Sequence, residues 1–334
     1  MIASMFPAGL AFAIAALALA LVSAIVYLIR TSRAMRPTLL AAMAAAFAAS
    51  YTLSLYQSYL GIGILGGALF ASSEAILFTI AAVGYFDKQS ALYYAVGIAA
   101  VVIIIAAFAH IPIAMLMQAF STGSLAGIAA SLRSHKGKVY NKRAADKSIE
   151  INRDLFQICS GIVLLLILIV SFSIGKYVVM SIVLIGYLTV SYLSRGKASD
   201  NALSRVLLSL ERPKTTFGLG AVYLSSGAFL VISLVPDFRL MLFGLVALFI
   251  ADSLATIVGL RIKSPRLPYN RRKSTAGSVM YFAALAIPAL LFVGYYAVIA
   301  AAVLALIEGF SSRLDDNITV AAALVVISAL MMVP

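Results

Sequence analysis

Long apolar runs, separated by short stretches that carry nearly all the charges, dominate the pattern of this 334-residue chain. A membrane-spanning helix needs about 20 mainly apolar residues, and about twelve segments meet that criterion. They lie at residues 6–29, 38–60, 62–85, 90–108, 110–132, 155–175, 177–194, 216–235, 239–260, 277–294, 297–313 and 318–333. The pattern therefore predicts an all-α, polytopic bundle of transmembrane helices. The first segment is expected to be a retained span, because it lacks the basic start of a signal peptide.

Composition and charge agree with this architecture. Hydrophobic residues make up 63% of the chain and charged residues 11%, whereas soluble domains have about 45–50% and about 25%. This excludes an ordinary soluble enzyme, a disordered protein and a nucleic-acid-binding module, despite a net charge of +13. Of the 25 basic residues, all but Lys176 and Arg239 fall on one side of the alternating spans. The positive-inside rule makes that side cytoplasmic and places both termini outside.

One break in composition suggests how the chain is organised. The basic stretch 133–153 separates an N-terminal membrane region of about five spans, residues 1–132, from about seven spans in residues 154–334. We expect this stretch to form a cytoplasmic loop. The early spans are rich in Ala and poor in charge, which favours helix packing over chemistry.

Several common kinds of site are excluded by the residues themselves. Cys159 is the only cysteine, so neither an intramolecular disulfide nor a multi-cysteine metal site can form. In its apolar run it is expected to be a small buried residue. The only histidines are His110 and His135, too few for a histidine-rich metal site. Residues 61–66 fit GxGxxG, but they lie between two predicted spans rather than between a strand and a helix. The candidates for a metal site are therefore oxygen ligands, which favour Mg²⁺.

Acidic residues inside predicted spans are the first candidates for chemistry, because a charge there is energetically expensive. They occur, with the adjoining junction, at four places: Glu74, Asp252, Glu308, and the run Asp315, Asp316 and Asn317. Asp252 is expected about 12 Å from the cytoplasmic end of its span. For Glu74, a structural role is as reasonable as a functional one. The run at 315–317 also suits a solvated turn that caps a helix.

A cationic loop follows Asp252 on the same predicted side. It contains six basic residues, Arg261, Lys263, Arg266, Arg271, Arg272 and Lys273, and a small-residue helix start at 274–278 comes next. Exposed N–H groups at a helix start beside Lys and Arg form a natural anion site, although such a loop also suits binding to anionic lipids. Carboxylates can hold Mg²⁺, Mg²⁺ can hold a polyphosphate, and cations can neutralise transferred charge. The combination predicts phosphoryl or nucleotidyl transfer between a cytoplasmic nucleotide and a lipid.

Residues from about 150 to 334 resemble the CTP-dependent polyprenol and dolichol kinase family, which includes phytol and diacylglycerol kinases and is distantly related to phosphatidate cytidylyltransferases. The resemblance rests on blocks in the family's order. Residues 150–153 resemble E-x-x-R-K, 214–218 with Tyr223 and Gly227 resemble a small Gly/Tyr span, and 251–259 resemble D-x-x-A-x-x-x-G. Residues 273–278 resemble K-S-x-E-G-S, 308–312 resemble E-x-x-S, and 316–320 resemble D-N-x-x-x-P.

The chain departs from the family pattern at four positions. Asp154 and Gln157 stand where the family has Lys and His, Ala276 replaces a Glu, and Ala321 replaces a Pro. The first two changes lie one and four residues after Arg153. The third removes an acidic side chain from the block at 273–278.

The resemblance implies an integral membrane kinase that transfers the γ-phosphoryl group of CTP to a lipid alcohol of polyprenol or dolichol type, with Mg²⁺ as cofactor. The implied catalytic residues are Asp252, Asp316 and Lys273. The implied metal ligands come from Asp252, Glu308, Asp315, Asp316 and Asn317. The residues expected at the nucleotide phosphates are Arg153, Lys214, Gly259, Arg271, Arg272, Lys273, Ser274, Gly277 and Ser278.

Two other functions fit the same features. A CTP-dependent cytidylyltransferase that makes a CDP-lipid would use the region from Asp252 to Gly277 equally well, whereas the ending at 316–319 is more like the kinases. A transporter or flippase of an anionic or polyprenyl-linked substrate would suit about twelve spans with buried carboxylates. The expected partners are a membrane lipid alcohol, CTP and anionic lipids at the cytoplasmic loops, and not nucleic acid.

Overall fold

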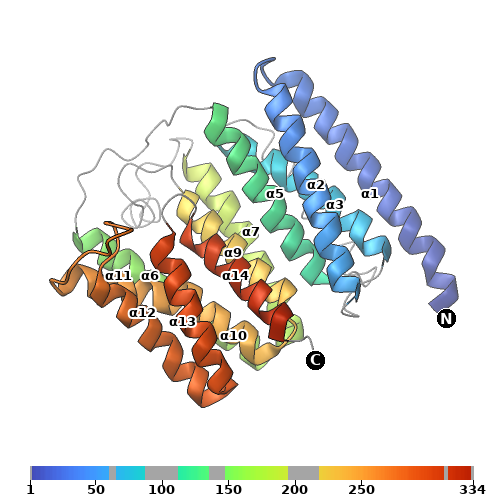
Figure 1. The fold of residues 1–334 in the computed structure, drawn as a ribbon. Helices are drawn as coiled ribbons and strands as arrows, with labels where there is room; N and C mark the ends of the chain where they lie inside the picture. Colours follow the sequence, from blue (N-terminus) through green and yellow to red (C-terminus); the bar gives the residue numbers. More distant parts are fainter. Residues whose placement is uncertain are drawn as a thin grey trace. The chain divides into compact units, whose positions relative to one another are not determined.

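The chain is almost entirely helical wherever its structure is described. A computed structural model describes residues 2–59, 65–86, 112–134, 147–194, 218–311 and 315–331 (Figure 1). Within these ranges there is no β-strand, only an isolated antiparallel bridge between Arg266 and Ser274. The predicted all-α class is confirmed for this part of the chain.

Internal packing divides the chain into two units. The N-terminal unit comprises residues 1–138 and 180–197, and the C-terminal unit comprises residues 139–179 and 198–334. Residues 180–194 pack with the N-terminal unit even though they follow the predicted break at 133–153 in the sequence.

The N-terminal unit is built around one buried helix. It contains α1 (Ile2–Arg30), α2 (Arg36–Tyr59), α3 (Leu65–Phe86), α5 (Ile113–Ser134) and the second part of α7 (Phe172–Ser194). Helix α3 contacts α1, α2 and α5 and is almost wholly buried. Glycines on α5 allow it to approach α3 closely, since a Cβ added at Gly127 would lie 2.7 Å from the carbonyl oxygen of Thr79 on α3. Small residues thus permit tight helix packing here.

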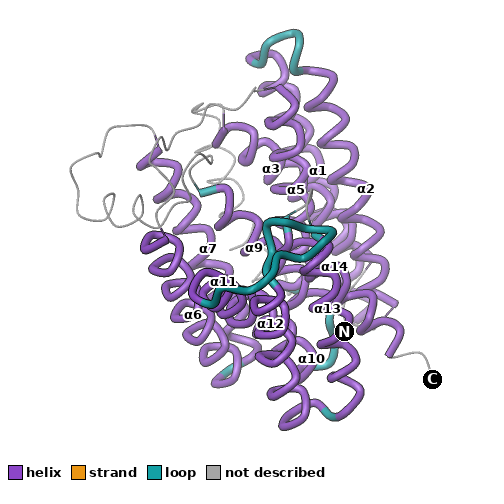
Figure 2. The backbone as a smooth tube through the Cα atoms, turned by 60° about the vertical axis from the view of Figure 1, so that its left-hand side comes forward, coloured by secondary structure: helices purple, strands orange, loops and turns teal. Residues whose placement is uncertain are grey.

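The C-terminal unit contains the predicted chemistry. Its helices are α6 (Lys147–Val170), the first part of α7, α9 (Leu219–Leu234), α10 (Phe238–Val246), α11 (Asp252–Arg261), α12 (Thr275–Pro288), α13 (Tyr295–Phe310) and α14 (Asp316–Met331). Two π-helical turns, η1 (Ala247–Ala251) and η2 (Ala289–Val293), continue α10 into α11 and extend α12. A loop of residues 262–274 joins α11 to α12 and is drawn in teal in Figure 2.

Eight helical segments in the described residues are long and apolar enough to cross a membrane. They lie in α1, α2, α3, α5, α6, α7, the continuous α10–η1–α11 segment and α12 with η2; α9, α13 and α14 are shorter apolar helices. Large apolar side chains such as Val170, Ile174 and Leu291 are exposed, as expected for surfaces that face lipid. Apart from 90–108, which lies outside the described residues, every predicted segment overlaps one of these helices. The total of about twelve spans and the external termini stay predictions.

Two local expectations were wrong in detail. Helix α6 begins at Lys147, inside the stretch predicted as a loop, and it ends at Val170 rather than near Lys176. The N–H of Gly175 bonds the carbonyl of Ser171 at 2.7 Å, so α7 starts early and contains Lys176. The Lys176 ammonium lies 4.3 Å from the centre of the Phe172 ring, a contact that helps a helical segment accommodate this charge. Cys159 is exposed on α6 rather than buried, because the apolar run faces outward there.

Candidate active site

Three carboxylates far apart in the sequence come together in the C-terminal unit. Asp252 is the first residue of α11, Glu308 lies in the last turn of α13, and Asp316 is the first residue of α14. Each offers an oxygen, and these oxygens all lie within 4.8 Å of one another. The packing of α11 on α12, of α12 on α13 and of α13 on α14 brings the three together. Glu308 is buried, and the other two are partly buried.

The ammonium group of Lys273 joins this carboxylate cluster. It donates a hydrogen bond to Oε1 of Glu308 and another, 2.8 Å long, to Oδ2 of Asp316. Burial favours the neutral amine, but attraction from Asp316, Asp252 and Glu308 outweighs burial and raises the pKa of Lys273 above its ordinary value. The lysine therefore keeps its positive charge at neutral pH.

The charge of the cluster suits a divalent cation. When all three carboxylates are counted as ionised and the lysine as protonated, the formal charge on Asp252, Glu308, Asp316 and Lys273 is −2. Oxygen Oε2 of Glu308 is buried and has no hydrogen-bond partner among the described residues. Uncompensated charge in such surroundings is expensive, and a hard divalent cation such as Mg²⁺ prefers carboxylate oxygens. The residues present therefore fit Mg²⁺ in both donor type and charge.

Asn270 ties the loop 262–274 to the end of α13. Its side-chain nitrogen donates 3.0 Å hydrogen bonds to the backbone carbonyls of Gly309 and Ser311. Its backbone carbonyl accepts a hydrogen bond from the backbone N–H of Lys273. The ring of Tyr269 stacks on Phe310 with 4.2 Å between centroids. These contacts hold the backbone of Lys273 beside the helix that carries Glu308. Asn270 belongs to no motif, so sequence reasoning missed it.

A π-helical turn precedes Asp252 and is held by α6. The side-chain nitrogen of Gln157 donates a 2.9 Å hydrogen bond to the carbonyl of Leu248, in η1. A π turn widens the helix and is frequent at functional sites. Gln157 thus holds the turn that ends at Asp252. No sequence signal marked this turn.

The predicted anion site at the start of α12 needs correction. Its N–H groups are not exposed, because each already has a protein acceptor. Thr275 donates to the carbonyl of Pro265, Ala276 to Oγ of Ser264, Gly277 to Oγ of Ser274 and Ser278 to the carbonyl of Ser274. Any phosphate there would have to be bound by side chains, and the nucleotide role of Ser274, Gly277 and Ser278 stays a prediction.

Two predicted phosphate-site glycines have a clear packing role. A Cβ at Gly259 would lie 2.7 Å from Oγ of Ser274, and a Cβ at Gly277 would lie 2.9 Å from the carbonyl of Ala255. Both glycines allow α11 and α12 to pack closely. This packing brings the start of α11, with Asp252, near the loop before α12, which contains Lys273.

The other predicted residues are distributed around the cluster. Arg153 pairs with Oδ1 of buried Asp154, its Nη2 at 2.6 Å. Arg271 and Arg272 are exposed on the loop, and Lys214 lies outside the described residues. Asp315 accepts from the backbone and side-chain nitrogens of Asn317, in the manner of a helix cap. Asp315 is therefore not one of the converging carboxylates, and a metal role for Asp315 and Asn317 stays a prediction.

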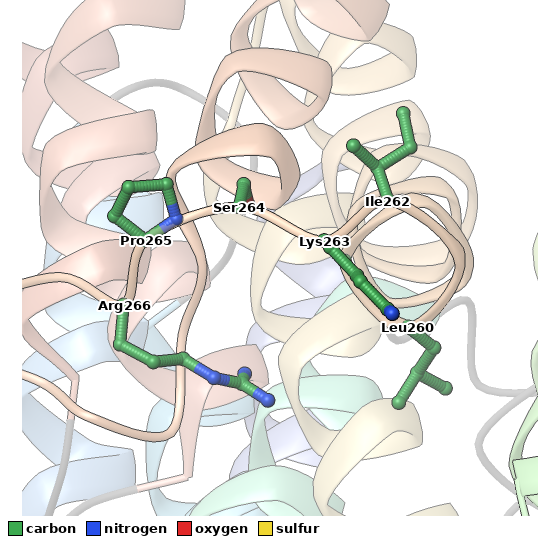
Figure 3. A pocket seen from close by; sticks show the side chains of 7 residues that line it. Leu260, Ile262, Lys263, Ser264, Pro265 and Arg266 are labelled. Carbon is green, nitrogen blue, oxygen red and sulfur yellow. The ribbon is translucent and has the colours of Figure 1, made fainter.

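A pocket of about 430 Å³ lies beside the start of the loop. It is lined by Gly259, Leu260, Ile262, Lys263, Ser264, Pro265 and Arg266. Figure 3 shows the long side chains of Lys263 and Arg266 leaving the loop on either side of Ser264. A Cβ added at Gly259 would lie 2.7 Å from Oγ of Ser274, so this cationic pocket lies next to the start of α12.

Comparisons with known proteins give a distant relative whose role is unassigned. An uncharacterized protein of Methanocaldococcus jannaschii is 32% identical over 114 residues, which cover 34% of this chain and 59% of that protein. The chain thus matches less than two thirds of the relative's length. No family model matches, and no solved structure matches. Similarity of this extent does not assign the chain to a family.

Proposed function

We propose that this protein is an integral membrane kinase that transfers the γ-phosphoryl group of CTP to a lipid alcohol of polyprenol or dolichol type. The observation that carries the proposal is the convergence of Asp252, Glu308, Asp316 and Lys273. Phosphoryl transfer requires positioning and charge neutralisation more than covalent chemistry from the protein. A cluster of formal charge −2 beside a cationic loop supplies both requirements.

Each part of the site takes a defined role in this proposal. Asp252, Glu308 and Asp316 would hold Mg²⁺, which would neutralise phosphate charge. Lys273 keeps two of these carboxylates oriented and adds a positive charge next to the transferred group. The remaining phosphates of the nucleotide are attracted by the exposed Arg271 and Arg272. They are also attracted by Lys263 and Arg266, which help to line the pocket.

The proposed reaction balances with these groups alone. The lipid hydroxyl oxygen forms a bond to the γ-phosphorus, while the bond from that phosphorus to the β,γ-bridging oxygen breaks. A carboxylate of the cluster accepts the hydroxyl proton, and CDP leaves with the electron pair of the broken bond. The exposed apolar faces of the helices allow the lipid substrate to approach from the bilayer.

Membranes that contain the protein test the proposal when they are supplied with Mg²⁺, a polyprenol and CTP labelled at either the α or the γ phosphate. We expect γ label to appear on the alcohol and α label to stay on the nucleotide. Transfer of α label to added phosphatidate would replace the kinase by a cytidylyltransferase. Folded protein that moves neither label would remove both enzymes and leave the transporter. The control is Asp252→Asn, which should transfer label roughly 10³-fold more slowly.

A further inference from the structure

A tyrosine that no motif includes lies on a helix that packs around the carboxylate cluster. Tyr281, on α12, is completely buried, and its hydroxyl has no hydrogen-bond partner among the described residues. Its helix packs on α11, which begins with Asp252, and on α13, which carries Glu308. Its hydroxyl interacts electrostatically with Asp252, Glu308 and Asp316. A buried hydroxyl without a partner lowers the stability of a fold, whereas a Phe would fill nearly the same space without that loss. The position of the phenol is therefore better suited to a bound ligand than to packing alone.

Ser278 supports the same conclusion from the preceding turn of α12. Its Oγ is also buried and lacks a hydrogen-bond partner among the residues that the structure describes. Hydroxyls in the helices of this protein commonly bond the carbonyl four residues earlier, as Ser72 and Thr256 do. Residues three apart share a face of a helix. Two adjacent turns of α12 thus carry hydroxyls that no described residue engages.

We infer that the Tyr281 hydroxyl is a further binding group of this site and donates a hydrogen bond to a phosphate oxygen of the nucleotide. The inference rests on the proposed function. A phenol has one hydrogen to donate, and a phosphate oxygen is a strong, charged acceptor that the bound nucleotide would bring to the carboxylates. Tyr281 does not hold the cation, because its neutral oxygen is a poorer partner for Mg²⁺ than three carboxylates are.

The variant Tyr281→Phe of the full-length purified protein tests this inference, with Mn²⁺ as the probe for Mg²⁺. Three quantities are measured: the unfolding midpoint without ligands, the affinity for Mn²⁺ alone by paramagnetic resonance, and the affinity for labelled CTP with Mn²⁺ but without lipid. We expect an unfolding midpoint that is not lowered and an unchanged Mn²⁺ affinity. The CTP affinity should fall roughly tenfold, the scale of one hydrogen bond to a charged group.

Tyr296→Phe is the matched control, because it removes the same atom from an exposed residue twelve positions before Glu308, about 18 Å along α13. It should bind CTP like the wild type. A Tyr281→Phe protein that binds CTP as tightly as the wild type overturns the inference alone. A lower unfolding midpoint, or weaker Mn²⁺ binding without nucleotide, also overturns it, because the hydroxyl would then serve the fold or the cation. Wild-type protein that binds no CTP overturns the proposed function and this inference together.

Discussion

Each of the two units buries a glutamate, and the two glutamates have opposite surroundings. Glu74, in the N-terminal unit, is fully buried, and neither of its oxygens has a hydrogen-bond partner among the described residues. Glu308, in the C-terminal unit, is also buried, but it pairs with Lys273 and lies beside two more carboxylates. Burial of an acid in an apolar helix is therefore not enough to identify a site. Convergence of charged groups from separate elements is the more specific observation.

The polar bonds of the two units differ in the same way. In the N-terminal unit many buried hydroxyls bond carbonyls of their own helix, as Thr79 bonds Ala75 at 2.7 Å. Gln118 is an exception, since it reaches Ser50 and Ser54 on α2. In the C-terminal unit the bonds of Lys273 and Asn270 cross between elements that are 35 to 43 residues apart. Bonds within one helix only give its buried hydroxyls a partner. Bonds between separate elements hold the side chains of a site in fixed positions.

The largest expected effect is the loss of turnover in Asp252→Asn, compared with the matched change Glu74→Gln in the N-terminal unit. Asp252→Asn removes one negative charge from the cluster and keeps the shape of the side chain, so we expect turnover to fall roughly 10³-fold, the scale of losing one charge contact to the transition state. The measurement is γ-label transfer by protein whose unfolding midpoint matches the wild type. Glu74→Gln makes the matched change in the N-terminal unit and should keep most activity. Equal losses in the two variants would contradict the comparison.

Lys273→Met should have the next largest effect, on stability. It removes the positive charge from three carboxylates, and breaking a buried ion pair costs about 3 kcal/mol, a value at the low end because the lysine is 22% exposed. We expect chemical unfolding in detergent to show this loss without divalent ions, and Mg²⁺ to restore part of it by binding the folded state. Lys263→Met, in the same loop but exposed, is the control and should change little. Unchanged stability of Lys273→Met would show that its ion pairs contribute nothing.

The smallest expected effect has opposite signs in the two units. Glu74→Met removes a carboxyl that lacks partners and should leave the free energy of unfolding unchanged or raise it by about 1 kcal/mol. Glu308→Met removes a partner of Lys273 and should lower it. Both variants are compared by chemical unfolding under identical conditions. A large loss of stability in Glu74→Met would show that this glutamate makes an essential interaction in its own unit.

Much of the fold was predictable because apolar length is a local property. The segment predicted at 239–260 appears as the continuous helix of residues 238–261, although it contains a π turn that no residue pattern announced. The start of α12 shows the limit of such reasoning. Ser274 was recognised beside a small-residue helix start, but only the folded loop shows that Ser264 and Pro265 already accept the N–H groups expected to bind an anion.

By itself, the sequence determined that the chain is helical and apolar enough for a membrane, and it marked Asp252, Glu308, Asp316 and Lys273 as separate candidates. Both results depend on residue type and on spacing within one helix, where the physics is local. Only the tertiary structure decided that these four side chains meet while Asp315 caps a helix, and that Asn270, Gln157 and Tyr281 surround them. Contacts between helices depend on how whole helix faces pack. That packing depends on many side chains along the chain together, so no single position predicts it.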